Sequence, residues 1–327
     1  MTLSILFCMV GFLMLYYGAG WLVKGSSGLA KSLGITPLVI GLTVVAFGTS
    51  APELVVSLIS SLKGKSMIAV GNVVGSNICN IALVLGLSAL FQPITSQRGV
   101  VQRDIPIMLF VSFILLFFSL DSKIDSLEGA VLFAGIILYT IFNYRIGIRM
   151  QLRKLTNDGA GTAEIVIKDT AYVASRKKQI VLIVLGITGV ILGAQAVVDS
   201  ATKIMQYLGV NEKFIGLTIV AFGTSLPELA TSIVAAIRKE MDISIGNLVG
   251  SNVFNILSVI GVTALVKPIY LPGGFIESGL LIDYLVMIFI SFLPWLMMWK
   301  TFTVSRSGGS VLLACYIGYF IYLLKTL

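Results

Sequence analysis

The chain consists of long apolar runs separated by short polar segments. Each run approaches or exceeds the roughly 20 residues that cross about 30 Å of hydrocarbon, where a helix can satisfy all of its own backbone groups. The pattern therefore predicts ten membrane-spanning helices. They lie near residues 3–22, 36–62, 67–91, 104–120, 127–147, 179–207, 213–237, 243–266, 280–299 and 309–326.

The composition is that of a membrane protein. Hydrophobic residues make up 57% of the 327 positions and charged residues only 12%, whereas a soluble domain carries about a quarter charged residues. The net charge of +8 does not indicate nucleic-acid binding, because Lys and Arg lie between the apolar runs rather than on a common face. We expect an all-α, polytopic protein.

One basic, polar stretch divides the chain. Residues 148–178 carry seven Lys and Arg among Asn, Asp and Gly residues, and we expect a flexible cytoplasmic linker loop because Lys and Arg are enriched on that side of a membrane. The loop separates residues 1–147 from residues 179–327. Alternation of ten spans then places both termini outside the cell membrane, although Lys63 and Lys65 also fall outside, against the charge rule.

The residues that most enzymes and zinc sites need are scarce. The chain has no histidine, which removes Ser-His-Asp and Cys-His catalysis and zinc sites of the HExxH type. Cys8, Cys79 and Cys315 all lie within apolar runs, which argues against disulfides. We expect no enzyme activity, no cofactor and no obligate protein partner.

An internal repeat relates the two halves. Residues 41–94 match residues 216–269 without a gap, with GLTVVAFGTSAPEL recurring as GLTIVAFGTSLPEL and GNVVGSNICNI as GNLVGSNVFNI. Each half contains five predicted spans. Because five is odd, the second unit must enter the membrane in the opposite orientation. Inverted-topology repeats of this kind are typical of secondary transporters with a site at mid-membrane.

The first repeated motif places a glutamate after a proline inside an apolar run. A carboxylate there costs at least a few kcal/mol, so Glu53 and Glu228 are expected to face a polar cavity and to meet a cation or carry a proton. Pro52 and Pro227 lack an amide hydrogen and obstruct the carbonyl four residues earlier, which predicts a broken helix with freed carbonyl oxygens. The hydroxyl residues beside the break are Thr49, Ser50, Thr224 and Ser225.

The second motif, GNxxGSNxxN, supplies further oxygen donors on the following span. Ser76 and Asn80 are four residues apart and share a helix face, as do Ser251 and Asn255. Carboxylate, amide, hydroxyl and carbonyl oxygens suit Ca²⁺, and also Na⁺ at lower charge, whereas transition metals would want Cys or His. Both motifs recur at one spacing, which favours an ion site over the alternative of helix packing and proline kinks.

In these motifs the sequence resembles the sodium/calcium exchanger family of the cation/calcium antiporter superfamily, whose paired repeats carry GTSxPE and GNxxGSN. The resemblance implies a Na⁺/Ca²⁺ antiporter that works by alternating access, with the first and sixth spans sliding past the remaining bundle. A third Na⁺, as the resemblance suggests, would make exchange electrogenic.

The resemblance also implies roles for individual residues. Ca²⁺ would be held by the carboxylates of Glu53 and Glu228 and the carbonyls of Thr49 and Thr224. The implied Na⁺ ligands are the Ala46 carbonyl, Ser50 and Ser251 on one side, the Ala221 carbonyl, Ser225 and Ser76 on the other, and the residues lining the central position are Asn80 and Asn255.

Two alternatives remain open, a proton-coupled cation antiporter and, with less support, a cation channel. Proton-coupled relatives tend to carry an acidic residue and a histidine in the second motif, where this chain has Gly75 and Ser76. Potassium-dependent relatives have an acid where Asn255 stands. A channel would use the same oxygen donors, although channels usually build their filters at an oligomer axis.

Overall fold

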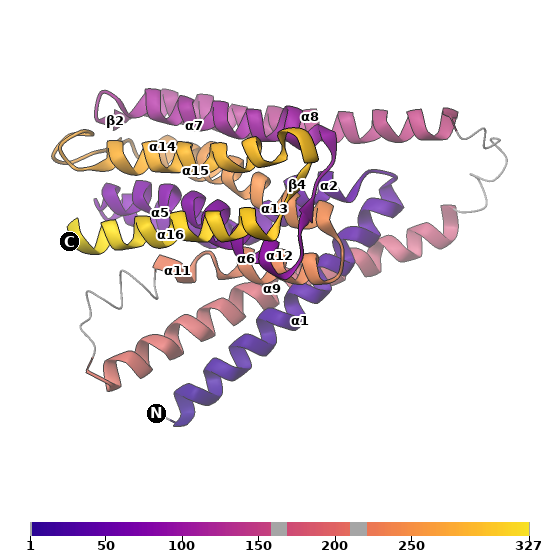
Figure 1. The fold of residues 1–327 in the computed structure, drawn as a ribbon, viewed down its shortest axis with the longest axis horizontal. Helices are drawn as coiled ribbons and strands as arrows, with labels where there is room; N and C mark the ends of the chain where they lie inside the picture. The colour runs from indigo at the N-terminus through magenta and orange to yellow at the C-terminus, as the bar shows by residue number, and fades with distance from the viewer. Residues whose placement is uncertain (1, 158–168, 210–220, 327) are drawn as a thin grey trace.

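The computed structural model describes residues 2–157, 169–209 and 221–326, with side chains for residues 2–149, 176–209 and 222–325. Helices dominate the fold (Figure 1). The first half contains α1 (Thr2–Leu33), α2 (Pro37–Ile40), η1 (Gly41–Val45), α3 (Ala46–Thr49), α4 (Ala51–Leu62), α5 (Ser66–Ile78), η2 (Cys79–Leu85), α6 (Gly86–Phe91), β1 (Ile94–Thr95), η3 (Val100–Asp104), α7 (Ile105–Ser119), β2 (Lys123–Ile124) and α8 (Ser126–Asn157). The second half contains α9 (Asp169–Tyr207), α11 (Ala221–Gly223), α12 (Leu226–Ile237), α13 (Met241–Phe254), η5 (Asn255–Ile260), α14 (Gly261–Val266), β3 (Ile269–Tyr270), α15 (Leu280–Thr301), β4 (Thr303–Val304) and α16 (Arg306–Thr326).

The predicted class, an all-helical polytopic membrane protein, is confirmed. Within the described ranges, eight helices are long and apolar enough to cross a membrane, and the bent pair Pro37–Thr49 and Ala51–Leu62 makes a ninth span. The predicted span near 213–237 lies partly outside the described residues, and its second part is α12. The count of ten spans stays a prediction.

Three helices extend beyond the predicted ends. The first span was expected to stop near residue 22, but α1 continues to Leu33 and ends at Gly34, whose φ of 70° lies in the left-handed region that favours glycine. Helices α8 and α9 both run into the predicted linker 148–178. The predicted ends followed the loss of apolar residues, but Lys and Arg are good helix formers and extend a helix into water. The middle of the predicted linker, 158–168, lies outside the described residues.

Two continuous helices form the core. Ser66–Phe91 combines α5, η2 and α6, and Met241–Val266 combines α13, η5 and α14. In each of these two helices, 78% of the most apolar 18-residue stretch is buried inside the protein, whereas the value for α16 is 11%. The repeated GNxxGSN motif therefore lies at the centre of the bundle, away from lipid.

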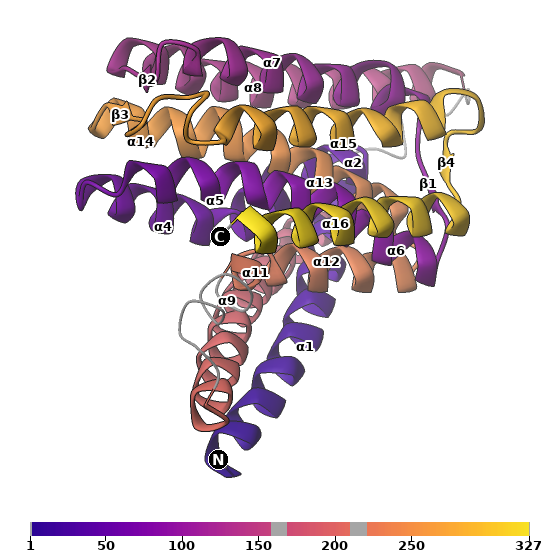
Figure 2. The same cartoon turned by 60° about the vertical axis from the view of Figure 1, so that its left-hand side comes forward.

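Helices α1 and α9 run side by side and lean away from the remaining bundle (Figures 1 and 2). Their contact is made by glycines. A Cβ atom on Gly186 would lie 2.5 Å from the backbone nitrogen of Leu22, and one on Gly18 would lie 2.9 Å from the carbonyl carbon of Gly189. The two backbones therefore pack directly against each other, as small residues allow in membranes.

Short strands tie the loops together at both ends of the bundle. Strand β1 pairs with β4, with Ile94 opposite Val304, and β2 pairs with β3, with Ile124 opposite Ile269. Ile94 and Ile269 are equivalent positions of the repeat, yet Figure 2 places β1 and β3 at opposite ends of the bundle. Such a placement is what repeats of opposite orientation require.

Candidate functional site

A broken helix in each half carries a glutamate to the centre of the protein. Helix α3 ends at Thr49 and α4 begins at Ala51, with a bend of 44° between the two arms. The equivalent break separates α11 from α12. Glu53 and Glu228 lie in the first turns of α4 and α12, where the helix dipole favours a negative charge, and neither is exposed to solvent. The break predicted from the prolines is confirmed.

Hydroxyl groups from both halves surround the carboxylate of Glu228. Ser50 Oγ donates a hydrogen bond to Glu228 Oε1 over 3.2 Å. Thr49 and Ser251 also lie beside this carboxylate, and their hydroxyl oxygens are 3.4 Å apart. Thr49 Oγ1 is oriented further by a 3.1 Å hydrogen bond to Asn247 Oδ1. One carboxylate of the second half is thus packed mainly against oxygens of the first.

Glu53 has related surroundings. Ser76 Oγ donates to Glu53 Oε1 over 3.4 Å, and Thr224 of the opposite half lies beside the same carboxylate. The backbone of this turn is held by Asn72, whose Nδ2 donates to the Glu53 carbonyl over 3.2 Å and to Ser57 Oγ over 2.9 Å. Asn72 therefore fixes the turn that carries the carboxylate.

Four asparagines form a reciprocal network between the core helices. Asn80 Nδ2 donates to Asn252 Oδ1 over 3.1 Å, and Asn255 Nδ2 donates to Asn77 Oδ1 over 3.0 Å. Asn77 and Asn252 each donate to the other's backbone carbonyl, over 3.3 and 3.4 Å. These bonds engage the amide nitrogens of Asn80 and Asn255 and leave their side-chain oxygens available.

The helix geometry at Asn80 and Asn255 is not that of an ordinary α-helix. The π-helical segment η2 begins at Cys79, and η5 begins at Asn255 itself. A π-helical turn adds one residue to the turn and re-aims the side chains that follow, and such turns are frequent at functional sites. The Asn255 amide still donates to the Ser251 carbonyl, as in an α-helix, so the π-helical turn changes the direction of the residues after Asn255.

Six buried oxygens at this centre have no hydrogen-bond partner in the described part of the chain. They are Oε2 of Glu53, Oε2 of Glu228, Oδ1 of Asn80, Oδ1 of Asn255, Oγ1 of Thr224 and Oγ of Ser225. Buried polar atoms are normally paired, because each unpaired group costs about 1–3 kcal/mol. Oxygens of three chemical kinds around two carboxylates fit a hard cation such as Na⁺ or Ca²⁺.

The structure brings most of the sequence-predicted residues to this centre. Those with side chains at or beside the two carboxylates or in the asparagine network are Glu53, Glu228, Thr49, Thr224, Ser50, Ser76, Ser251, Asn80 and Asn255, while Ser225 stands at the break of the second helix. The Ala46 carbonyl accepts hydrogen bonds from the Ser50 amide and, more weakly, from Thr49 Oγ1. Ala221 opens α11, and its side chain is outside the described set.

Sequence reasoning did not select the residues that orient the ligands. Asn77 and Asn252 belong to the second motif but are not among the predicted ion ligands, and neither are Asn72 and Asn247. A usable signal was present, because both pairs recur at the repeat offset of 175 residues inside an apolar span. An amide in such a span needs a partner.

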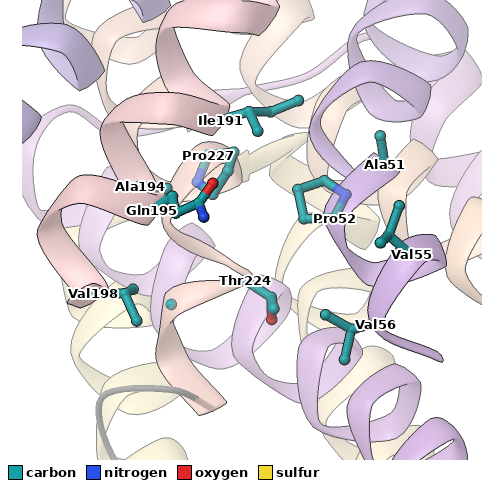
Figure 3. Close-up of a pocket in the computed structure, with 11 residues that line it drawn as sticks. Ala51, Pro52, Val55, Val56, Ile191, Ala194, Gln195, Val198, Thr224 and Pro227 are labelled. Atoms are coloured by element: carbon teal, nitrogen blue, oxygen red, sulfur yellow. The ribbon is translucent and has the colours of Figure 1, made fainter. Parts of the chain in front are cut away.

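A cavity of about 420 Å³ lies next to the centre, between α4 and α9 (Figure 3). Its lining is mostly apolar and includes Pro52, Val55 and Ile191, with Thr224 and Gln195 as polar members. On the pseudo-equivalent side, α1 packs on α12 and the following turn. There Arg238 Nη1 donates to the Gly20 carbonyl over 2.8 Å, and Ser27 Oγ donates to Glu240 Oε1 over 2.9 Å. The centre therefore has a cavity beside it between α4 and α9, whereas α1 packs over it on the α12 side.

The fold and the centre define a class: a polytopic helical membrane protein with a cation-type oxygen site between two repeated units. The family model for "Sodium/calcium exchanger protein" matches residues 3–145 and 178–325. The chain belongs to the sodium/calcium exchanger family.

Relatives match over nearly the whole length. The putative antiporter CaxA of Alkalimonas amylolytica is 35% identical over 98% of both chains. The sodium/calcium exchanger MaX1 of Methanosarcina acetivorans is 31% identical over 98% of this chain and 99% of its own. A solved structure of the sodium-calcium exchanger NCX_Mj, soaked with 2.5 mM Na⁺ and 0.1 mM Ca²⁺, superposes with a TM-score of 0.80 at 32% identity over 96% of both chains.

Proposed function

We propose that this protein is a secondary antiporter that exchanges Na⁺ for Ca²⁺ by alternating access. The observation that carries the proposal is the set of six unpartnered buried oxygens around Glu53 and Glu228. In the described part of the chain no Lys or Arg side chain lies beside these two fully buried carboxylates, which therefore call for a bound cation or proton. The family membership and the solved relative soaked with Na⁺ and Ca²⁺ support the choice of ions.

The proposed roles follow from charge and donor type. Both carboxylates, with the Thr49 and Thr224 carbonyls, bind Ca²⁺, because Ca²⁺ takes six to eight oxygens and prefers carboxylates. The Na⁺ ligands are the Ala46 carbonyl, Ser50 and Ser251 on one side, and the Ala221 carbonyl, Ser225 and Ser76 on the other. Asn80 and Asn255 line the central position with their free Oδ1 atoms.

The two kinds of ion exclude each other at this site. When ionised, the two glutamates carry two negative charges, which one Ca²⁺ or two Na⁺ neutralise. A Ca²⁺ loaded together with two Na⁺ would leave two excess positive charges in a poorly solvated centre, which costs more than the single excess charge of three Na⁺. A third Na⁺ would carry one net charge across the membrane per cycle and make exchange electrogenic.

The open cavity on the α4–α9 side and the packed α1–α12 side support alternating access. If α1 and α9 move together past the bundle, closing α9 onto α4 would release α1 from α12. Close packing between α1 and α9 at their glycines suits movement of the two helices as one unit. Residues 1–147 and 179–327 would then be two inverted halves, with ten spans in all, joined by a linker at 148–178.

We further propose that the protein lies in the cell membrane with the linker in the cytoplasm and both termini outside. Most of the 23 Lys and Arg fall on the cytoplasmic side in this arrangement. The α4–α9 cavity then opens outward. Reaction of a single cysteine introduced near residue 157 with an impermeant reagent from outside intact cells would contradict the orientation.

The experiment that tests the function is Ca²⁺ uptake by vesicles reconstituted with the purified protein. Uptake against a Ca²⁺ gradient is expected when the vesicles contain Na⁺, and none when internal Na⁺ is replaced by K⁺ or when the Na⁺ gradient is collapsed. A channel would only dissipate the Ca²⁺ gradient. Uptake driven equally well by a proton gradient without Na⁺ would favour the proton-coupled alternative.

A further inference from the structure

Gln195 on α9 is a polar residue without a structural role in the described part of the chain. Its amide makes no hydrogen bond there, and Figure 3 shows it pointing from α9 into the space that faces Pro52 of α4. An amide with no role in the cavity could turn away from this mostly apolar lining. Its direction into the cavity beside the ion site is the observation from which the inference starts.

Gln195 is also shared by two cavities. The inner one is the cavity of about 420 Å³ that reaches Thr224, whose hydroxyl is buried without a partner and lies beside Glu53. The outer one, about 350 Å³, lies along the ends of α1 and α9 and includes Asp199 and Lys203. Gln195 is exposed and therefore lies at the border of both cavities, within reach of an ion in either one.

The sizes of the cavities decide what can pass. A water molecule occupies about 30 Å³ in the liquid, so about 420 Å³ holds a cation with its first shell of about six waters. Beyond that point the cation must lose water to reach the glutamates, and Pro52, Val55 and Ile191 offer no oxygen in exchange. The side-chain oxygen of Gln195 is suited to take the place of the first water that is lost.

The repeat-equivalent position on the opposite side lacks this feature. At the offset of 175 residues, Gln195 corresponds to Gly20 and Asp199 to Lys24. The Gly20 carbonyl is already engaged by Arg238. The side of Gln195 therefore has an amide with Asp199 and Lys203, whose charges balance. The opposite side has Lys24 and Arg238 with Glu240, which leaves a net positive charge, so the two sides attract cations unequally.

We propose that Gln195 is a transient ligand for Na⁺ and Ca²⁺ at the entrance between α4 and α9, and that Asp199 raises the local cation concentration one turn further out. The entrance is built on one repeat only. This inference rests on the proposed exchange function. If the inference is right, replacing Gln195 changes the half-saturating Ca²⁺ concentration measured from one face of the membrane and leaves the value measured from the other face unchanged.

The test measures the half-saturating Ca²⁺ concentration from each face, in vesicles of both orientations, for wild type, Gln195→Leu and Gln195→Glu. Gln195→Leu is expected to raise it roughly fivefold on the α4–α9 face alone, as loss of one oxygen contact does, with the maximal rate unchanged. Gln195→Glu is expected to lower it on that face, and this gain should shrink at high salt. Gln206→Leu, on the same helix but lining neither cavity, is the matched control and should equal wild type.

Each other result overturns the inference. Equal shifts on both faces would mean that Gln195 acts through the central site or through stability, and no shift would mean that it does not meet the ion. A shift of the same size in Gln206→Leu would also contradict the assignment. If the wild-type protein does not couple Ca²⁺ transport to Na⁺, both the exchange function and this inference are wrong. If the wild-type protein couples the two ions but Gln195→Leu behaves like it, only the inference is wrong.

Discussion

Replacing Asn252 with alanine should weaken ion binding through Asn80, a residue that it orients. Asn252 Oδ1 accepts the 3.1 Å hydrogen bond from Asn80 Nδ2. Without it, a fully buried amide donor loses its partner, at a cost of about 1–3 kcal/mol. Nothing then holds the amide with its side-chain oxygen free, so in the ion-free protein the amide turns to pair its donor, and Ca²⁺ binding must reverse that turn. We expect the half-saturating Ca²⁺ concentration to rise roughly 5- to 150-fold, which is the same range expressed as a ratio.

A double-mutant cycle separates orientation from direct contact. If Asn252 acts through Asn80, adding Asn252→Ala to Asn80→Ala should cost little more than Asn80→Ala alone, with a coupling energy of at least about 1 kcal/mol. The assay is Na⁺-driven Ca²⁺ uptake at matched amounts of monodisperse protein. Asn252→Ala combined with the distant Gln206→Ala serves as the additive control. Losses for Asn252 and Asn80 that add within about 0.5 kcal/mol would refute the orienting role.

Three further predictions concern the carboxylates, pH and the helix pair. Glu53→Gln and Glu228→Gln should each abolish Na⁺-driven Ca²⁺ uptake, whereas Asn255→Asp should retain it with altered pH or K⁺ sensitivity; equal loss in all three would contradict the assigned roles. Uptake should fall as pH is lowered from neutral to about 5 and recover at higher Ca²⁺, because a proton and a cation exclude each other at a carboxylate; a flat profile would count against this. Gly186→Ala should lower the melting temperature, because the added Cβ would meet the α1 backbone at a cost of about 1–3 kcal/mol. Gly318→Ala, which adds a Cβ into open space, is the control and should leave the melting temperature unchanged. Equal melting temperatures for the two variants would disprove the close packing of α1 and α9.

The features that the sequence predicted well are those fixed by strong local physics. Long apolar runs can only be helices in lipid, so the helical class followed from hydropathy. Pro52 and Pro227 cannot continue a helical hydrogen-bond ladder, so the breaks beside Ser50 and Ser225 followed from the residue type. The pairing of the two motifs at one centre followed from their repetition.

The features that it missed depend on tertiary geometry. Asn80 and Asn255 lie at the starts of π-helical segments, and no local residue signal distinguishes these segments from α-helix. Which asparagine donates to which carbonyl depends on how the two core helices cross. The position of Gln195 in a cavity depends on the separation of α4 and α9, which is a property of the whole arrangement of helices. Helix ends were missed because water does not stop a charged helix, as α8 shows.

The central claim is that Glu53 and Glu228 form one site that holds either Ca²⁺ or Na⁺. The most direct measurement is equilibrium binding of radioactive Ca²⁺ to the purified protein at rising Na⁺ concentrations, for wild type, Glu53→Gln and Glu228→Gln. The account predicts that Na⁺ displaces Ca²⁺ completely from wild type, more steeply than a single competing ion would, and that neither variant binds Ca²⁺ at the same concentrations. Ca²⁺ binding that Na⁺ does not displace, or that survives in both variants, would contradict it.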